Sequence, residues 1–522
     1  MKISVRIIAV LSALILVFSS LSFAAEDTKS LAKTAMNETV ASMAANYRKN
    51  YPEFGNEWAV MALGLSGTSG LDTVFSKYYE SVRKYVETRI PSVNFEGAEN
   101  AIDRNRSTEN ARLIIALSSI QKYATAVGQY DITKPFNSFT WITRMGLMGP
   151  VYTLIALDTY GYQTADPSIR QQCIDYILNA QLANGGWDIA KRNADADTTA
   201  MVLQALYAYR SQAKVKAAAD KAFTWLSGAQ FKDGGFSSYG FENSGSAAQV
   251  LIALCTWGIN PLTDSRFIKN GNTVLSNLLT FRVKDSKLGW GFTHTKEDSN
   301  NGSEKYKGGA YVAMSTEQGA YALIAYNRFT SAQKSIYDMS SLKPFTDISA
   351  QSNRNDIEYC WNSGLMNGVG NNKFNPSGTF TRAMLVTTLY RLAGSPKVSG
   401  SSSFTDAVKG SWYANALKWA EDKGIAGGYG NGKFGPEDAI SPEQTWTFLF
   451  RFAKLMGYDT KESMSISSFM DSAKVSSWAL DAAKWAASYG IIKTEDGKLN
   501  PGSQSTRALS ATYLARFDIN VK

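Results

Sequence analysis

Two kinds of hydrophobic pattern alternate over roughly residues 30–340 of this chain. Six segments are apolar on nearly every side, are rich in small residues, and centre on an Ala-Leu pair. The pairs are Ala62-Leu63, Ala116-Leu117, Ala156-Leu157, Ala205-Leu206, Ala253-Leu254 and Ala322-Leu323. A helix that is apolar all round is buried on all sides. Because more amphipathic stretches such as 169–180 precede them, we predict six inner helices inside an outer ring.

A glycine-rich motif recurs in the loops before three of these inner helices. The sequence AQLANGGWDI at 180–189 returns as AQFKDGGFSS at 229–238, and KLGWGF at 287–292 is a weaker copy. Glycine closes a helix C-terminus, and we expect the following aromatic ring to fold back over the helical hairpin. The repeat resembles that of the prenyltransferase and squalene-cyclase superfamily. This resemblance implies a mostly α-helical fold, an α/α toroid of six helical hairpins over residues 26–340.

A second repeat with a different period occupies residues 343–522. Each copy begins with Phe-x-Asp and contains an amphipathic helical stretch, a glycine-rich turn ending in proline, and a second helical stretch. The prolines of the three turns are Pro376, Pro436 and Pro501. The order of these motifs resembles S-layer homology modules. We therefore expect three such modules, at 343–396, 403–459 and 468–522, with a flexible linker at 394–403.

The second resemblance implies a binding partner, a secondary cell-wall polysaccharide that often bears a pyruvate ketal. In this family an arginine at a helix start holds the acidic substituent, and a tryptophan and an aspartate of the next module complete the groove. The residues at these positions here are Arg382, Asp406, Trp412, Asp471, Trp478, Arg507 and Asp347. Pro442 and Ser352 occupy one arginine and one tryptophan position. We expect Arg382 to face Trp412 and Asp406 in the one complete groove, the alternative being that Arg382 is a solvated charge at a helix start.

Composition narrows the function further. Of 522 residues, 44% are hydrophobic, and only 1 is His and 3 are Cys, which argues against a protein-built zinc site. We expect no metal and no cofactor. The net charge of +9 is mild for this length and forms no basic run, so we expect no nucleic-acid partner. A polyanionic surface such as a cell-wall polymer suits this charge, although mere solubility explains it equally well.

The N-terminus resembles a secretory signal peptide over residues 1–25. Lys2 and Arg6 precede an apolar run that is interrupted by serines, and small residues follow for cleavage after Ala24 or Ala25. We expect export without a transmembrane anchor after cleavage, to the cell wall or S-layer of a Gram-positive-type bacterium. The three cysteines, at 173, 255 and 360, are expected to be buried free thiols.

One enzymatic candidate lies at the start of the fourth inner helix. The sequence Asp195-Ala196-Asp197-Thr198-Thr199-Ala200 resembles the acid motif of squalene cyclases. The resemblance implies that Asp197 would protonate an alkene or epoxide, but Thr198 replaces the supporting carboxylate. The alternative, which we favour, is that Asp197 or Thr198 caps the helix.

Glycan lyases and hydrolases also use toroids and need paired carboxylates. Asp195, Asp197, Glu317 and Glu109 all lie at predicted inner-helix starts, where they could share one rim. Polar helix starts are common, so we favour a toroid that binds an unidentified ligand or partner without chemistry. The alternative is a secreted enzyme that acts on an isoprenoid or a glycan.

Overall fold

The computed structural model describes residues 2–522 apart from 94, 239, 301–304, 462, 493 and 495, and side chains from residue 26 onward except that of 300. The side chains of the predicted leader, residues 1–25, thus lie outside the described residues. The chain forms two compact units, Met1–Ala124 with Asp131–Leu342, and Thr125–Tyr130 with Lys343–Lys522. Among the described residues, no helix combines the length and apolarity needed to cross a bilayer.

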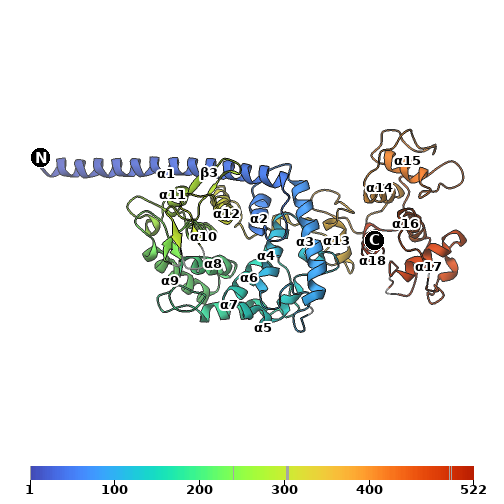
Figure 1. The fold of residues 1–522 in the computed structure, drawn as a ribbon, viewed down its shortest axis with the longest axis horizontal. Coiled ribbons are helices and arrows are strands. Elements are labelled where there is room, and N and C mark those ends of the chain that lie inside the picture. Colours follow the sequence, from blue (N-terminus) through green and yellow to red (C-terminus); the bar gives the residue numbers. More distant parts are fainter. Residues whose placement is uncertain are drawn as a thin grey trace. The chain divides into compact units, whose positions relative to one another are not determined.

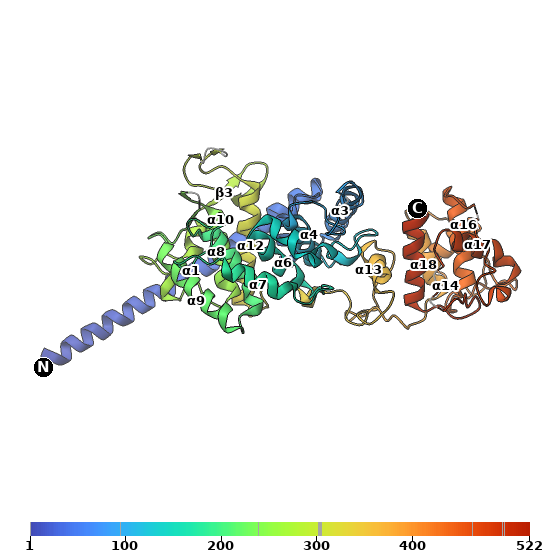
Figure 2. The same cartoon turned by 90° about the horizontal axis from the view of Figure 1, so that it is seen from below.

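The first unit is built around six inner helices, which are labelled in Figure 1 and are seen from another side in Figure 2. They are α2 (Glu57–Leu65), α4 (Ser107–Ser119), α6 (Met148–Thr159), α8 (Ala196–Leu206), α10 (Ser244–Thr256) and α12 (Ala313–Thr330). Each packs against the next, and α12 packs back against α2. Every residue of α10 is buried. The six Ala-Leu pairs all lie in these helices, so the predicted α/α toroid is confirmed.

The outer helices surround this ring. They are α1 (Lys2–Lys49), α3 (Asp72–Val93), α5 (Phe139–Ile142), α7 (Ile169–Asn179), α9 (Ala213–Ala229) and α11 (Val274–Leu279). Among them, α3, α7 and α9 each bury one side and expose the other to solvent. Helix α7 packs on α6, α9 on α8, α11 on α10, and α1 on α12. This alternation of outer and inner helices follows the alternation of hydrophobic patterns along the sequence.

The glycine motif fixes how two of the hairpins close. Gly185 and Gly234 adopt φ values of +94° and +88°. A β-carbon at Gly185 would lie 2.8 Å from the carbonyl oxygen of Lys221, and one at Gly234 only 2.3 Å from that of Thr273. Both sites therefore require glycine for two reasons: the positive φ, and the close approach of a neighbouring backbone. The aromatic residues that follow, at 187 and 236, are fully buried as expected.

The third copy of the motif folds differently from the other two. It forms strand β4 (Gly289–Phe292), which pairs antiparallel with β3 (Arg282–Asp285) in the register Arg282 with Phe292. Two shorter antiparallel hairpins join β1 (Ser237–Ser238) to β2 (Phe241–Glu242) and β5 (Ser299–Asn300) to β6 (Lys305–Tyr306). All three hairpins lie in loops that precede the inner helices α10 and α12.

The second unit repeats a pair of helices three times. These are α13 (Arg354–Asn362) with α14 (Arg382–Leu392), α15 (Ala414–Asp422) with α16 (Pro442–Met456), and α17 (Leu480–Ser488) with α18 (Arg507–Asn520). The second helix of each module packs on the first helix of the next, α14 on α15, α16 on α17, and α18 on α13. The three modules therefore close into a cycle.

Three equivalent residues mark the centre of this cycle. The N–H of Phe380 donates to the carbonyl of Ser505 (3.3 Å), that of Ser505 to Ile440 (2.8 Å), and that of Ile440 to Phe380 (3.0 Å). Each residue directly precedes the N-cap of a second helix, and all three are buried. This ring of backbone hydrogen bonds gives the unit a pseudo-threefold axis.

Candidate functional site

A groove of about 380 Å³ lies along helix α14 in the second unit. Its lining includes Asn367 from the glycine-rich turn of module one and Thr387 and Arg391 from α14. Module three contributes Arg507, and module two contributes Trp412. The indole of Trp412 is 58% exposed, which is unusual for so large an apolar group and leaves its face available for a ligand.

The helix-start arginines tie neighbouring modules together. Arg382 donates from Nε to the carbonyl of Phe434 (2.8 Å) and from Nη2 to that of Gly427 (2.7 Å). Arg507 makes the equivalent bonds to Phe374 (2.8 Å) and Asn367 (2.6 Å). Each arginine thus reaches into the turn of the following module. Burial lowers the pKa of both guanidinium groups below their ordinary value.

This geometry corrects the pairing expected from the sequence. Trp412 shares its groove with Arg507, not with Arg382. The reason is that a groove is centred on the second helix of one module, receives its arginine from the preceding module, and receives its tryptophan from the following one. We expected a groove between two consecutive modules, one giving the arginine and the next the tryptophan. In the structure a third module lies between those two and forms the groove with its second helix.

The same packing rule predicts which residues flank the other two second helices, α16 and α18. Arg382 contacts the turn that precedes α16, and the short helix that contains Trp478, Ser477–Ala479, packs on α16. Around α18, Asn353 donates to the carbonyl of Ala508 at 2.7 Å, next to the position where a tryptophan would stand. Pro442 and Ser352 therefore fall in the same groove. The rule therefore predicts two positions, along α14 and α16, that keep both an arginine and a tryptophan, instead of the single one expected.

The three predicted aspartates hold the turns of their own modules. The carboxylate of Asp406 accepts hydrogen bonds from the backbone N–H groups of Phe434 and Gly435. Asp471 and Asp347 accept equivalent pairs of bonds, from residues 499 and 500 and from residues 374 and 375. Desolvation acts to raise the pKa of Asp406 and Asp471, but these N–H donors outweigh it and hold each pKa below the ordinary value.

At the rim of the toroid, Asp195 and not Asp197 caps helix α8. Asp195 accepts a hydrogen bond from the backbone N–H of Thr198 at 2.8 Å, so the expected cap at Asp197 or Thr198 is wrong. Asp197 stands inside the first turn, and its Oδ1 is buried without a hydrogen-bond partner among the described residues. Burial, opposed by Ser246 and reinforced by Asp195, raises the pKa of Asp197 to about 6.

A second group of carboxylates lies at the starts of α2, α4 and α12. Burial, with a contribution from Glu57, raises the pKa of Glu317 to about 7, against a hydrogen bond from Tyr47. Glu109 forms an ion pair with Arg112 at 2.6 Å. The sequence pointed to Glu317 and Glu109 but missed Glu57 and Tyr47. These two residues carry no motif, and Tyr47 stands 270 positions from its partner.

All three cysteines are free and buried, as predicted. His294 contacts the ring of Tyr306 at a centroid distance of 4.1 Å and approaches the hydroxyl of Ser315 at 3.4 Å. Within the described part of the chain, no group of three His, Cys, Asp or Glu side chains could hold a metal ion.

The C-terminal ends of the inner helices are crossed by residues 331–342, which we call the strap. Ile336 and Met339 of the strap are buried, and the Tyr337 hydroxyl donates to Gln204 of α8 at 2.8 Å. Pockets of about 270 and 370 Å³ adjoin the strap and share Lys334 in their linings.

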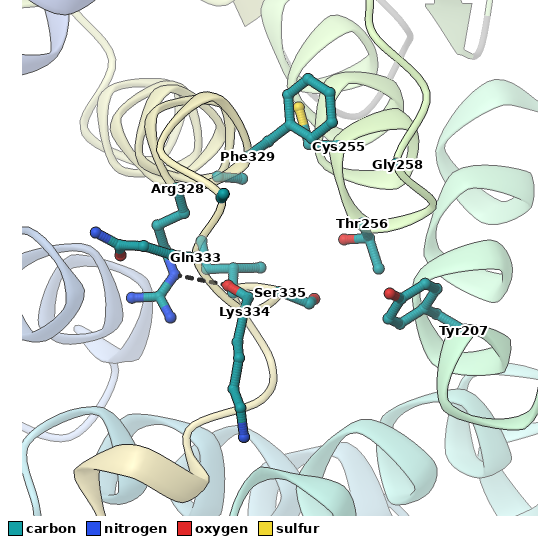
Figure 3. Close-up of a pocket in the computed structure, with 12 residues that line it drawn as sticks. Tyr207, Cys255, Thr256, Gly258, Arg328, Phe329, Gln333, Lys334 and Ser335 are labelled. Atoms are coloured by element: carbon teal, nitrogen blue, oxygen red, sulfur yellow. Dashed lines mark hydrogen bonds between the residues drawn. The ribbon is translucent and has the colours of Figure 1, made fainter.

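Figure 3 shows the smaller of these two pockets. Tyr207 and Thr256 face Arg328 and Gln333 across it, and Nε of Arg328 donates to the carbonyl of Lys334 at 3.1 Å. Arg328 lies in the last turn of α12, where a cation complements the helix dipole. Hydrogen bonds to α8 and to α12 therefore hold the strap against this end of the ring.

Comparison with known families identifies the repeats of the second unit. The S-layer homology domain family matches residues 344–383, 403–444 and 468–508. The C-terminal unit thus contains three S-layer homology domains. Each match spans the Phe-x-Asp start, the first helix, the turn and the first residues of the second helix.

Several curated proteins share part of this sequence. They include an amylopullulanase of Thermoanaerobacterium thermosulfurigenes (27% identity, 40% of this chain and 11% of that protein) and Exoglucanase XynX of Acetivibrio thermocellus (29%, 33% and 16%). The Surface-layer 125 kDa protein of Lysinibacillus sphaericus is 27% identical over 37% of this chain and 16% of its own length. The chain therefore spans less than a fifth of these relatives.

Solved structures similar to this chain include the type II terpene cyclase MstE from Scytonema. The alignment covers 58% of this chain and 99% of the cyclase, at 12% identity and a TM-score of 0.38. The assignment of the toroid rests on its own closed ring of helices.

Proposed function

We propose that this protein is exported, is held non-covalently to a polysaccharide of the cell wall by its three S-layer homology domains, and displays its toroid at the cell surface. The signal-peptide pattern supports export. An amylopullulanase, an exoglucanase and a surface-layer protein each share a similar segment with this chain. A segment found in proteins with such different names supports a role in attachment to the cell surface.

The observation that carries the proposal is the groove along α14, which Arg507 and the exposed Trp412 line together. Arg382 and the exposed Trp478 flank α16 in the equivalent way. An indole face stacks against the apolar face of a sugar ring. A guanidinium donates charge-assisted hydrogen bonds to a carboxylate, each worth about 1.5–3 kcal/mol. These groups suit a wall polysaccharide with acidic substituents such as pyruvate ketals. Two intact grooves on one rigid cycle also make attachment bivalent, which strengthens it beyond either groove alone.

Tryptophan substitutions in the full-length protein test this proposal. Trp412→Ala and Trp478→Ala should each weaken sedimentation with purified Gram-positive cell walls, because each removes one stacking surface. The double variant should lose far more than either single variant, since it removes both points of a bivalent attachment. Val408→Ala serves as the control because Val408 is also an exposed apolar residue, at 62%.

The result that would overturn wall attachment is equally clear. Binding of the double variant that equals binding of the unmodified protein would show that the grooves do not hold the wall. A full loss with Trp412→Ala and none with Trp478→Ala would instead show that only one groove is used.

For the toroid, we propose a role in binding a ligand or partner. The strap supports this role because its buried side chains pack against one end of the ring and pockets of about 270 and 370 Å³ adjoin it there. An enzyme acting on an isoprenoid or a glycan is the second candidate. It is favoured by one observation, the buried and unpartnered Oδ1 of Asp197.

A further inference from the structure

Each module carries an arginine nine residues after the start of its second helix. These residues are Arg391 in α14, Arg451 in α16 and Arg516 in α18. The three arginines occupy equivalent positions in the repeat. Their actual partners differ, and this difference separates the grooves.

In two of the three modules the arginine is already engaged. Arg451 donates from Nη1 to the carbonyl of Ile425 at 3.2 Å. Arg516 forms an ion pair with Asp356 at 3.6 Å, and both side chains are four-fifths buried. In each of these two guanidinium groups a terminal nitrogen is therefore engaged by another part of the protein.

Arg391 is different because its side chain is exposed and lines the groove beside Arg507 and Trp412. Among the described residues, its only hydrogen bond runs from Nε to the carbonyl of Thr387 in its own helix, at 3.4 Å. Neither of its terminal nitrogens donates a hydrogen bond to another described residue. Arg507, by contrast, already donates from Nε and Nη2 to two backbone carbonyls.

We propose that Arg391 is the anion-recognising residue of the groove along α14, and that it makes this groove depend on carboxylate substituents more than the groove along α16 does. The two free nitrogens of its guanidinium form a planar fork that matches a carboxylate. Trp412 supplies the surface for the sugar ring, and Arg507 adds its remaining donor. At the equivalent position along α16, Arg451 has one terminal nitrogen tied to the carbonyl of Ile425, so this groove binds by stacking on Trp478 with less dependence on acidic groups. This inference rests on the proposed attachment to the wall.

The test uses the full-length protein with Trp478→Ala, so that the groove along α14 acts alone. The probes are purified wall polysaccharide in its native form and after mild acid has removed its ketal-linked acids. Arg391→Gln should lower affinity for the native polymer about tenfold and leave affinity for the stripped polymer unchanged. Arg391→Lys should recover only part of the loss, because an ammonium lacks the fork. Lys397→Gln removes an exposed cation of the linker and is the charge-matched control.

The outcomes separate this inference from the function on which it rests. An equal effect of Arg391→Gln on both polymers, or no effect on the native one, overturns the assignment of Arg391 while wall attachment stands. Equal affinity of the Trp478→Ala protein for both polymers overturns the selectivity for acidic sugars. Failure of the unmodified protein to bind either polymer overturns the proposed function itself.

Discussion

The hydroxyl of Tyr337 donates a hydrogen bond to Oε1 of Gln204, although 133 positions separate the two residues in the chain. Gln204 belongs to an inner helix, and Tyr337 belongs to the strap that leads to the first S-layer homology domain. Met339 adds a bond from its N–H to the carbonyl of Thr159 at 3.2 Å. The strap is thus part of the toroid and not a flexible linker.

Removing the Tyr337 ring should destabilise the toroid. Tyr337 is half-buried, so Tyr337→Ala should lower the free energy of unfolding by about 2–3 kcal/mol, less than the usual loss for a fully buried aromatic side chain. Tyr337→Phe should cost about 1–3 kcal/mol, because it leaves the Gln204 oxygen without its donor. Urea unfolding followed by circular dichroism measures both, with Tyr51→Ala as the control because Tyr51 is 45% exposed.

The strap also refines the boundary for a truncated toroid. A fragment of residues 26–342 keeps the bond from the Tyr160 hydroxyl to the carbonyl of Leu342 and should melt cooperatively. A fragment that ends at residue 330 lacks the whole strap and should melt at a lower temperature. Equal melting temperatures for the two fragments in calorimetry would show that the strap does not stabilise the ring.

The sequence predicted those features that depend on local pattern. The six inner helices followed from apolar residues on all sides, and the closures at Gly185 and Gly234 followed from a repeated motif. The groove partners of Trp412 were predicted wrongly, because they depend on which module packs on which, and all three modules share one local pattern. The strap was missed for a related reason: its burial comes from the ring beneath it and leaves no periodicity in its own sequence.

Arg382 should matter for the stability of the second unit, whatever it contributes to binding. Arg382→Ala removes the donors to the carbonyls of Phe434 and Gly427 and should lower the free energy of unfolding by about 2–5 kcal/mol. Arg391→Ala, an exposed site, should change it by less than about 0.5 kcal/mol. Calorimetry of the two full-length variants measures the difference between these losses of stability. A wall-binding defect of Arg382→Ala with unchanged stability would show that its contacts with module two are dispensable.

Glu317 should make the stability of the toroid depend on pH. Its pKa is about 7 in the folded protein against 4.5 for an unperturbed carboxyl, so the folded state prefers the protonated form. This favourable contribution is complete below pH 4.5 and is lost as pH rises through 7, with a total of roughly 3 kcal/mol. Glu317→Gln stays neutral and can still accept the bond from Tyr47, so it should be more stable than the unmodified protein at pH 8 and similar near pH 4. Urea unfolding of both proteins between pH 4 and pH 8 measures this difference in the free energy of unfolding. Parallel pH profiles would show that Glu317 does not cause the pH dependence.

The two aspartates at the start of α8 should respond in opposite ways to substitution. Asp195→Ala removes the cap on Thr198 and should cost about 0.5–2 kcal/mol. Asp197→Asn removes a buried carboxyl whose pKa is about 6, so it should stabilise the toroid above that pH, where the unmodified side chain is charged and its Oδ1 lacks a partner. We expect neither variant to change the fate of squalene incubated with the purified protein, because Thr198 stands where a cyclase has its supporting carboxylate. Product formation by the unmodified protein that Asp197→Asn abolishes would instead establish Asp197 as a catalytic acid.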